Sequence, residues 1–289
     1  MLDKKELKVY IKSKYPYIFA VLKFGNRIWT PCWYQLLKMK AEIFKLYVFL
    51  YMLVNKKLVA EYTLGNRIPM KFRLFDNRQS KKVHITEEVY TDVLQRIGNG
   101  SFAYYGATYD FLQNALKEHP VRGKSVLVCG LESCNCDMIS IYHGADKVYV
   151  TDYQPVLHDH PQVQSYHVDD FAKSGIKVDM IISISSFEHD GLGRYGDPLV
   201  PEGDLKAMEN VRRQLKDDGL LFLAVPVGPD CICINAGRIY GHVRLPLLLK
   251  GWEVVDSYGF EKSLCDGEPS IYSRRQPVFV LRKCASEAV

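Results

Sequence analysis

Short apolar segments alternate with helix-length segments from Lys124 to Lys283, and this alternation restricts the chain to few fold classes. Strands that alternate with helices form βαβ units, whose strands lie parallel in one sheet. The pattern therefore predicts an α/β fold with a doubly wound, mostly parallel, seven-stranded sheet. The seven expected strands are residues 125–129, 147–151, 164–168, 179–185, 219–227, 252–258 and 277–283.

The chain divides into two predicted parts. Residues 1–82 are basic and rich in aromatic residues, and we expect them to form a helical N-terminal extension. Residues 83–289 form the α/β domain, with the core of its sheet in 124–283. Two helices, 86–97 with Thr86 as its cap and 108–118, are expected to lead into the first strand.

The composition and the N-terminal residues indicate a folded protein with reduced thiols. With 289 residues, 47% of them hydrophobic and 25% charged, the chain can bury a sizeable core and is unlike a disordered one. Its eight cysteines are typical of reduced thiols rather than of a disulfide framework. The first residues do not form a signal-peptide pattern, and the longest apolar run, 46–54, is too short to cross a bilayer. We therefore expect a cytoplasmic location.

The segment from Ile43 to Leu53 is apolar on all sides of a predicted helix. Two interpretations are open: a helix buried between the extension and the main domain, or a basic, aromatic-rich helix that lies on a membrane surface. Nucleic acid is not expected as a partner, because no recognised motif accompanies the basic residues. One face of the helix holds Ile43, Leu46, Tyr47, Leu50 and Leu53, and the remainder holds Phe44, Val48, Phe49 and Met52.

Ligands of a doubly wound sheet bind beyond the carboxyl ends of its strands, so the residues just after each strand are candidates for a site. Gly130 follows the first strand, where it either lets the chain pass close to a ligand or only makes a tight turn. Asp152 follows the second strand, about twenty residues later, where an acid accepts hydrogen bonds from both ribose hydroxyls of a nucleoside. A helix cap or a solvated loop residue is the alternative for Asp152.

The densest cluster of ionisable groups, residues 185–198, follows the fourth strand. His189 is the leading candidate for a general base, because the unperturbed pKa of histidine is near neutrality. Glu188 would orient His189 or contact the ligand; alternatively, both side chains only tie the loop together by hydrogen bonds.

Further polar residues are expected on the same edge of the sheet. Arg194, with Tyr195 and Asp197, would form a substrate-facing surface suited to a carboxylate or phosphate, unless Arg194 and Asp197 are a structural pair. After the fifth strand, an anion-binding pocket would be completed by Asn235, Arg238, Tyr240 and Arg244.

Two Cys-X-Cys pairs, Cys134 with Cys136 and Cys231 with Cys233, raise the question of a metal. Zinc ligands are usually spaced by two or more residues, so we expect packed thiols and no metal. The sequence also lacks a Walker loop, a Gly-X-Ser-X-Gly elbow and a His-Glu-X-X-His helix. Their absence removes the common NTPase and hydrolase alternatives.

The end of the chain resembles class I methyltransferases. A helix ending at 247–251, a strand, a long connection from Gly259 to Gln276 and a last strand resemble the closing hairpin of that family, in which the last strand is antiparallel. The resemblance implies S-adenosylmethionine as cofactor. Its implied contacts are Gly130, Glu132, Asp152 and Ser185, with Asp169 or Asp170 at the adenine amino group.

A narrower resemblance covers the second half of the chain. Residues 186–197, 203–208 and 221–228 resemble an uncharacterised domain family first named from Caenorhabditis proteins, and the likeness continues to residues 276–279. This family brings no established reaction with it. The Glu188-His189 pair also resembles the Glu-His found at this strand end in many small-molecule methyltransferases.

The sequence therefore predicts an S-adenosylmethionine-dependent methyltransferase that acts on an unidentified small or medium polar acceptor. Whether the chain is an enzyme stays open, because the loop after the first strand has one glycine, Gly130, where methyltransferases usually have two or three. The alternative is a catalytically inactive, methyltransferase-like protein that binds a nucleoside or a partner, with membrane-surface contact through residues 1–82 as a variant.

Overall fold

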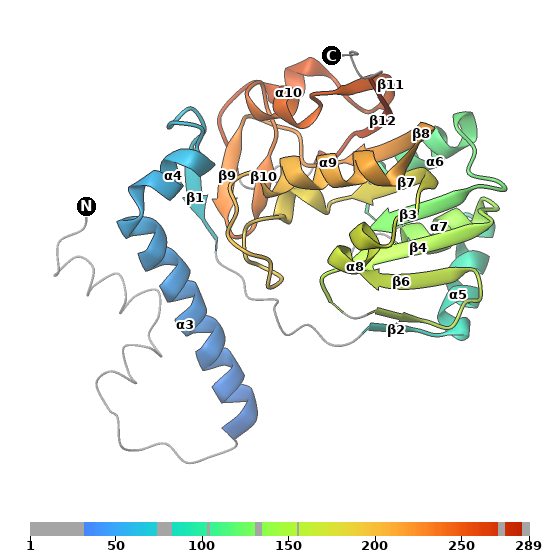
Figure 1. Cartoon of the computed structure of the whole chain (residues 1–289), viewed down its shortest axis with the longest axis horizontal. Helices are drawn as coiled ribbons and strands as arrows, with labels where there is room; N and C mark the ends of the chain where they lie inside the picture. The colour runs from blue at the N-terminus through green and yellow to red at the C-terminus, as the bar shows by residue number, and fades with distance from the viewer. Residues whose placement is uncertain are drawn as a thin grey trace.

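A seven-stranded sheet with strand order β11-β12-β8-β7-β3-β4-β6 forms the centre of the molecule (Figure 1). This computed structural model describes residues 32–73, 83–102, 105–130, 135–154, 156–270 and 275–284. The strands are β3 (Ser125–Cys129), β4 (Lys147–Asp152), β6 (Val163–His167), β7 (Val178–Ile184), β8 (Leu215–Ala224), β11 (Trp252–Tyr258) and β12 (Val278–Lys283).

The pairing of these strands confirms the predicted fold class. Strands β6, β4, β3, β7 and β8 are parallel to one another, whereas β12 is antiparallel to both β8 and β11. The chain passes from β3 outward to β4 and β6, and then returns to β7 on the other side of β3. The strand order therefore reverses between β3 and β7, which is where a doubly wound sheet binds its ligands.

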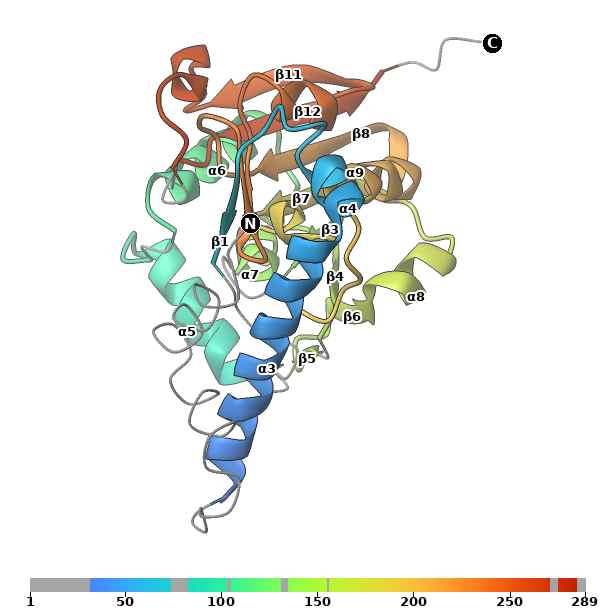
Figure 2. The same ribbon diagram turned by 90° about the vertical axis from the view of Figure 1, so that its left-hand side faces the viewer.

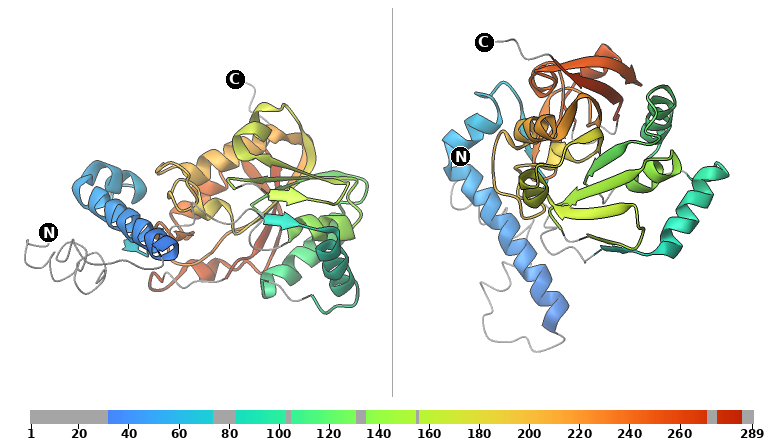
Figure 3. Two further views of the ribbon diagram at one scale, coloured as in Figure 1. Left: turned by 90° about the horizontal axis from the view of Figure 1, so that it is seen from below. Right: turned by 45° about the vertical axis from the view of Figure 1, so that its right-hand side comes forward.

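Helices cover both faces of the sheet (Figure 3). On β3, Val126 and Val128 pack with one layer of helices, while Leu127 and Cys129 pack with the other. Side chains of successive strand residues point to opposite faces, so a strand buried on both faces is apolar throughout. The first layer comprises α5 (Glu87–Gly98), α6 (Ala107–Glu118) and α7 (Cys136–Tyr142), and the second α8 (Val168–Lys173), α9 (Gly203–Gln214) and α10 (Arg244–Leu248).

The largest difference between the predicted and the observed bounds of an element is at the junction of α9 and β8. The helix ends at Gln214, and β8 begins at Leu215, four residues before the predicted start. Leu215 is fully buried and pairs with Val178 of β7, so tertiary contact extends the strand into a segment that reads as polar. Thr86 is the residue before α5, as predicted, but its side chain makes no capping hydrogen bond.

The described part of the extension contains two helices and one strand. They are α3 (Cys32–Val54), α4 (Lys56–Tyr62) and β1 (Met70–Phe72), so the prediction of helix alone is incomplete. Strand β1 pairs parallel with β9 (Cys231–Ile234), which pairs antiparallel with β10 (Gly237–Ile239). The extension therefore joins a small sheet formed by residues far along the chain. A separate apolar cluster holds it there: Val48, Met52, Tyr62, Ile68, Leu192, Ile232 and Ile234.

Two short strands, β2 (Val83–Ile85) and β5 (Val156–His158), pair parallel beside α5. Helix α3 stands out from the sheet domain in two perpendicular views (Figures 1 and 2). Among the helices of the described ranges, none combines the length and the apolar character needed to cross a membrane.

Candidate functional site

A cleft of about 740 Å³ lies at the carboxyl ends of β3, β4 and β7. Its volume is within the range of small-molecule and cofactor sites. The floor contains Gly130 and Ser185, which directly follow β3 and β7, and Asp152, which is the last residue of β4. Residues of β2 and α5 form one wall, and residues of α9 form another. The cleft thus lies at the switch point of the sheet, where the sequence predicts a site.

Gly130 and Asp152 follow two residues, Cys129 and Thr151, that are paired across neighbouring parallel strands. Gly130 has a φ of +77°, and a Cβ on it would lie 2.6 Å from the Oγ of Ser186. Any larger residue would push apart the loops after β3 and β7, so glycine is required here. The Asp152 carboxylate lines the cleft.

Glu188 and His189 lie in a short 3₁₀ helix, η1 (Phe187–His189), within the loop from β7 to α9 (residues 185–202). Glu188 is 1% exposed, and its Oε1 accepts a hydrogen bond of 2.7 Å from the hydroxyl of Ser185. Burial raises the pKa of Glu188 to about 7, although this hydrogen bond opposes the rise. Near neutral pH the Glu188 carboxyl is therefore divided between its neutral and charged forms.

His189 has a fixed tautomer. Its Nδ1 lies 2.7 Å from the carbonyl oxygen of Ala236, which only accepts, so Nδ1 carries the hydrogen and Nε2 keeps a lone pair. Nε2 is 3.7 Å from Oε1 of Glu188. Burial, and next the positive charge of Arg194, lower the pKa of His189 to about 3. Partial burial thus moves the pKa of His189 away from the near-neutral value of an unperturbed histidine, whereas burial brings the pKa of Glu188 toward neutrality.

Ser185 connects Glu188 and His189 to the C-terminal part of the chain. Its backbone has a φ of +54°, a conformation that is uncommon for serine. The Ser185 hydroxyl accepts a hydrogen bond of 3.2 Å from the side-chain amide of Gln276, which also donates to the hydroxyl of Tyr105 at 3.2 Å. The carbonyl of Gln276 accepts from Thr108 at 2.8 Å. Three segments of the chain, around residues 105–108, 185–188 and 276, thereby fix the Glu188 carboxyl.

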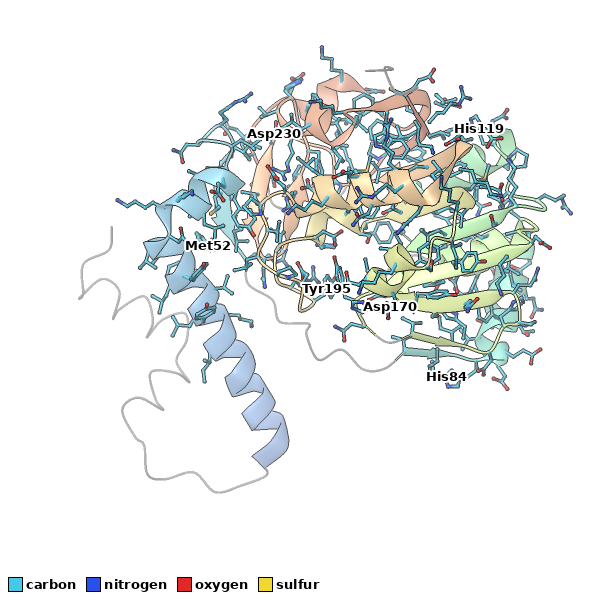
Figure 4. All side chains as sticks on the ribbon, in the orientation of Figure 1. Met52, His84, His119, Asp170, Tyr195 and Asp230 are labelled. Atoms are coloured by element: carbon cyan, nitrogen blue, oxygen red, sulfur yellow. The ribbon has the colours of Figure 1, made fainter. Side chains whose placement is uncertain are left out.

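The next residues of the loop form a turn around Asp197. Its carboxylate accepts hydrogen bonds from the backbone amides of Gly193 at 2.9 Å and Tyr195 at 3.1 Å. Arg194 donates to the Ala236 carbonyl at 3.4 Å, and its guanidinium lies 5.0 Å from the centre of the Tyr195 ring. Asp197 and Tyr195 both line the cleft, and Figure 4 labels Tyr195.

The structure contradicts the expectation that Asn235, Arg238 and Tyr240 help to form an anion-binding pocket. These side chains are buried, Arg238 to the point of 1% exposure. The Arg238 guanidinium donates to the carbonyls of Glu188 at 3.3 Å, Asp190 at 2.6 Å and Pro201 at 3.1 Å. Arg238 therefore holds the site loop from behind instead of facing a substrate.

Asp204, in the first turn of α9, explains why these basic residues can be buried. Arg244 donates to both its oxygens, at 2.8 and 2.6 Å, and the Tyr240 hydroxyl donates to it at 3.0 Å. Arg238 lies 3.6 Å from the same carboxylate. A buried charge must be paired and hydrogen-bonded, and Asp204 meets that requirement for two arginines.

Asp169 and Asp170 lie in the first turn of α8 with exposed side chains, and the cleft lining takes Val168 from this region instead. Carboxylates at a helix N-terminus are stabilised by its dipole, which gives them a structural role. Glu132 lies outside the described residues.

Two cleft residues were missed by sequence reasoning. Tyr153 and Asp190 both line the cleft and share a hydrogen bond. Burial, and next the charge of Asp197, raise the pKa of Asp190 well above its ordinary range. Asp190 stands beside His189 in the ionisable cluster and Tyr153 directly follows Asp152, so proximity to a predicted residue was the only available signal.

The cysteines that the structure describes are thiols. Cys136, Cys231 and Cys233 are buried, and Cys134 lies outside the described residues. Within the described ranges, no group of three or more His, Cys, Asp or Glu side chains has an arrangement that could hold a metal ion.

The sheet order, the antiparallel last strand and the cleft at the switch point define a Rossmann-like α/β domain of the class I methyltransferase type. Within that class, the chain belongs to the family described as "Caenorhabditis protein of unknown function, DUF268", whose model matches residues 123–273. No curated protein matches the sequence.

Solved structures similar to this chain include several methyltransferases. One is 1,6-didemethyltoxoflavin-N1-methyltransferase of Burkholderia thailandensis, with 15% identity, a TM-score of 0.46 and coverage of 68% of this chain and 88% of that chain. An S-adenosylmethionine-dependent methyltransferase of Clostridium acetobutylicum has 9% identity, a TM-score of 0.41 and coverage of 68% and 99%. The N-methyltransferase NodS of Bradyrhizobium japonicum has 12% identity, a TM-score of 0.40 and coverage of 61% and 94%.

Proposed function

We propose that this protein transfers a methyl group from S-adenosylmethionine to a small or medium polar acceptor. The observation that carries the proposal is the placement of Gly130 and Asp152 side by side, at the ends of neighbouring parallel strands, in the floor of the cleft. A carboxylate at this place accepts hydrogen bonds from two adjacent ribose hydroxyls. The buried thiols fit a reducing compartment, and we include a cytoplasmic location in the proposal.

The residues of the cleft fit this cofactor in charge as well as in shape. Asp152, Asp190 and Asp197 all line it. When bound, S-adenosylmethionine supplies a methyl carbon on a positively charged sulfonium, and the bond to sulfur breaks as a lone pair of the acceptor attacks that carbon. The carboxylates of Asp152 and Asp197 favour a cationic ligand over an anionic one, since opposite charges attract in a partly dry site.

Glu188 and His189 have different roles toward the proton that the acceptor loses. The Nε2 lone pair of His189 accepts the proton of an acceptor O–H or N–H, but an imidazole whose pKa is lowered to about 3 does not retain it. Glu188, whose pKa is raised to about 7, is the stronger base; its Oε1 lies 3.7 Å from Nε2, beyond direct hydrogen-bond distance, so the proton would pass to it through one bridging water. His189 thus orients the acceptor, and Glu188 serves as the final base.

Calorimetric titration with S-adenosylmethionine and S-adenosylhomocysteine tests the cofactor site. We expect binding of both, lost in Asp152→Ala and unchanged in Asp169→Ala. The two variants are matched because both remove an acid that the sequence assigns to the cofactor, whereas only Asp152 lines the cleft. Equal binding by Asp152→Ala and the native protein would refute the ribose role.

The alternative is a methyltransferase-like protein without catalysis that binds a nucleoside or a partner. The single glycine of the described part of the loop after β3 supports it, because fold alone does not establish activity. Titration separates the two: no binding of either compound at millimolar concentration favours a partner-binding role, and binding justifies a screen of acceptors for methyl transfer.

A further inference from the structure

Helix α3 has two apolar faces, and only one of them is covered. Val48 and Met52 are each 1% exposed and pack in the apolar cluster that holds the extension to the domain. Along another side of the helix, an exposed face is formed by residues spaced four, three and four apart, which places them in one stripe. Its members are Ile43 at 51% exposure, Tyr47 at 57%, Leu50 at 36% and Val54 at 78%.

This exposed stripe is unusual for a helix of a globular domain. Single exposed apolar residues are common, but a contiguous row of large ones marks a binding surface. The helix stands out from the sheet domain (Figures 1 and 2), so the row is presented on a projecting element. The cluster around Met52 fixes the helix to the domain by its opposite face.

The charges near the stripe indicate what kind of surface covers it. Among the exposed charged residues of 42–73, one is acidic, Glu61, and the others are basic. A second copy of the chain would bring like charges together, whereas an anionic lipid surface would attract them. An apolar stripe flanked by basic residues is the pattern of a helix that lies in the plane of a membrane interface. Lys56 and Lys57 follow the helix after one residue; the others, Arg67, Lys71 and Arg73, come later in the chain, and Lys71 donates a hydrogen bond of 2.7 Å to the carbonyl of Pro269.

We propose that the exposed face of α3 binds the surface of a membrane that contains anionic lipid. The apolar side chains enter the interface, and the lysines and arginines that follow the helix contact the lipid headgroups. The tie between the extension and the domain makes this contact orient the whole molecule. The buried Tyr62 of α4 donates a hydrogen bond of 2.5 Å to the carbonyl of Gly191, in the loop that lines the cleft.

Vesicle sedimentation with the full chain tests this proposal. We expect the protein to sediment with vesicles of phosphatidylcholine containing about 30% phosphatidylserine, much less with phosphatidylcholine alone, and less as salt rises from about 0.1 to about 1 M. The double variant Tyr47→Asp/Val54→Asp should weaken binding about tenfold or more, because it places two charges in the apolar stripe. We expect this double variant to remain folded, since both changed side chains are exposed.

A second double variant controls for the loss of exposed apolar area in general. Leu247→Asp/Val254→Asp changes two exposed apolar residues of the sheet domain, at 38% and 46% exposure, and should bind vesicles like the native protein. Absence of sedimentation with anionic vesicles would overturn the proposal, as would equal binding by Tyr47→Asp/Val54→Asp. A dimer in light scattering that this variant converts to monomer would also overturn it, because a second copy would then cover the stripe.

Discussion

Replacing Glu188 by glutamine should change how stability depends on pH. The carboxyl is 1% exposed, and burial raises its pKa from an ordinary 4.5 to about 7. The folded protein therefore binds this proton more tightly than the unfolded chain does. Between these two pKa values the folded state holds more protons, so the free energy of unfolding falls as pH rises. Above pH 7, the charged carboxyl costs about 3 kcal/mol, from about 1.4 kcal/mol per pH unit.

Glutamine has nearly the same shape as glutamate and does not ionise, so the free energy of unfolding of Glu188→Gln should not fall with pH for this reason. In urea unfolding, the native protein should lose about 3 kcal/mol relative to the variant between about pH 5 and about pH 8. Buried histidines also affect the curve: burial lowers the pKa of His158 from 6.5 to about 4. Their contribution, lost as pH falls below 6.5, is common to both proteins and cancels in the comparison.

An exposed carboxyl supplies the matched control for this experiment. Glu209, whose side chain is 65% exposed, pairs with Arg213 on the surface of α9, and Glu209→Gln should unfold in parallel with the native protein at both pH values. If the native protein and Glu188→Gln also keep a constant difference from pH 5 to 8, Glu188 does not titrate near neutrality and cannot be the base of the site.

Two further substitutions test how the site loop is held. Arg238→Met should lower the free energy of unfolding by about 3–5 kcal/mol, because it removes the donor to three loop carbonyls and one partner of Asp204. In the same urea assay, the control Arg213→Met, which removes an exposed ion pair, should change the free energy of unfolding by at most about 1 kcal/mol. Tyr62→Phe should cost about 1–3 kcal/mol, since the buried Gly191 carbonyl loses its hydroxyl donor; a thermal midpoint equal to that of the native protein would show that this bond does not fasten the extension.

The main sheet is predictable from sequence because each of its strands is a local apolar run. Residues 125–129 and 178–184 are buried on both faces and read as strands without knowledge of their neighbours. The small sheet is different. Strand β1 has three residues within a basic segment and pairs with β9, about 160 residues away. Such short strands are defined by their partners rather than by their own composition.

The candidate site, like the fold, has one part that the sequence predicts and one part that depends on packing. Topology alone brings Gly130, Asp152, Ser185 and His189 to one cleft, because the carboxyl ends of parallel strands share an edge. Sequence position says nothing about the depth of a side chain or its pKa. The low pKa of His189 and the raised pKa of Glu188 arise from burial, which only the packed loop produces.

The error over Arg238 and Arg244 changes the predicted chemistry of the ligand. From the sequence, these arginines would give the cleft a positive potential that selects a carboxylate or phosphate. In the structure, Asp204 and loop carbonyls satisfy them inside the core. Among the described residues that line the cleft, the charged side chains other than histidine are Asp152, Asp190, Asp197 and a single lysine, Lys206.

A cleft with this balance of charge favours a cationic or neutral ligand. Asp190 is kept largely neutral by burial and by its proximity to Asp197, so a cation that enters the cleft lowers the pKa of Asp190 and draws out its proton. The carboxylates of Asp152 and Asp197 disfavour an anionic acceptor, and among the described residues that line the cleft, Lys206 is the one basic side chain other than histidine that could offset a further negative charge. Under the proposed function, the acceptor most compatible with this site carries an amine or a hydroxyl. The buried arginines, which the sequence assigns to an anion pocket, instead fix the loop that holds His189.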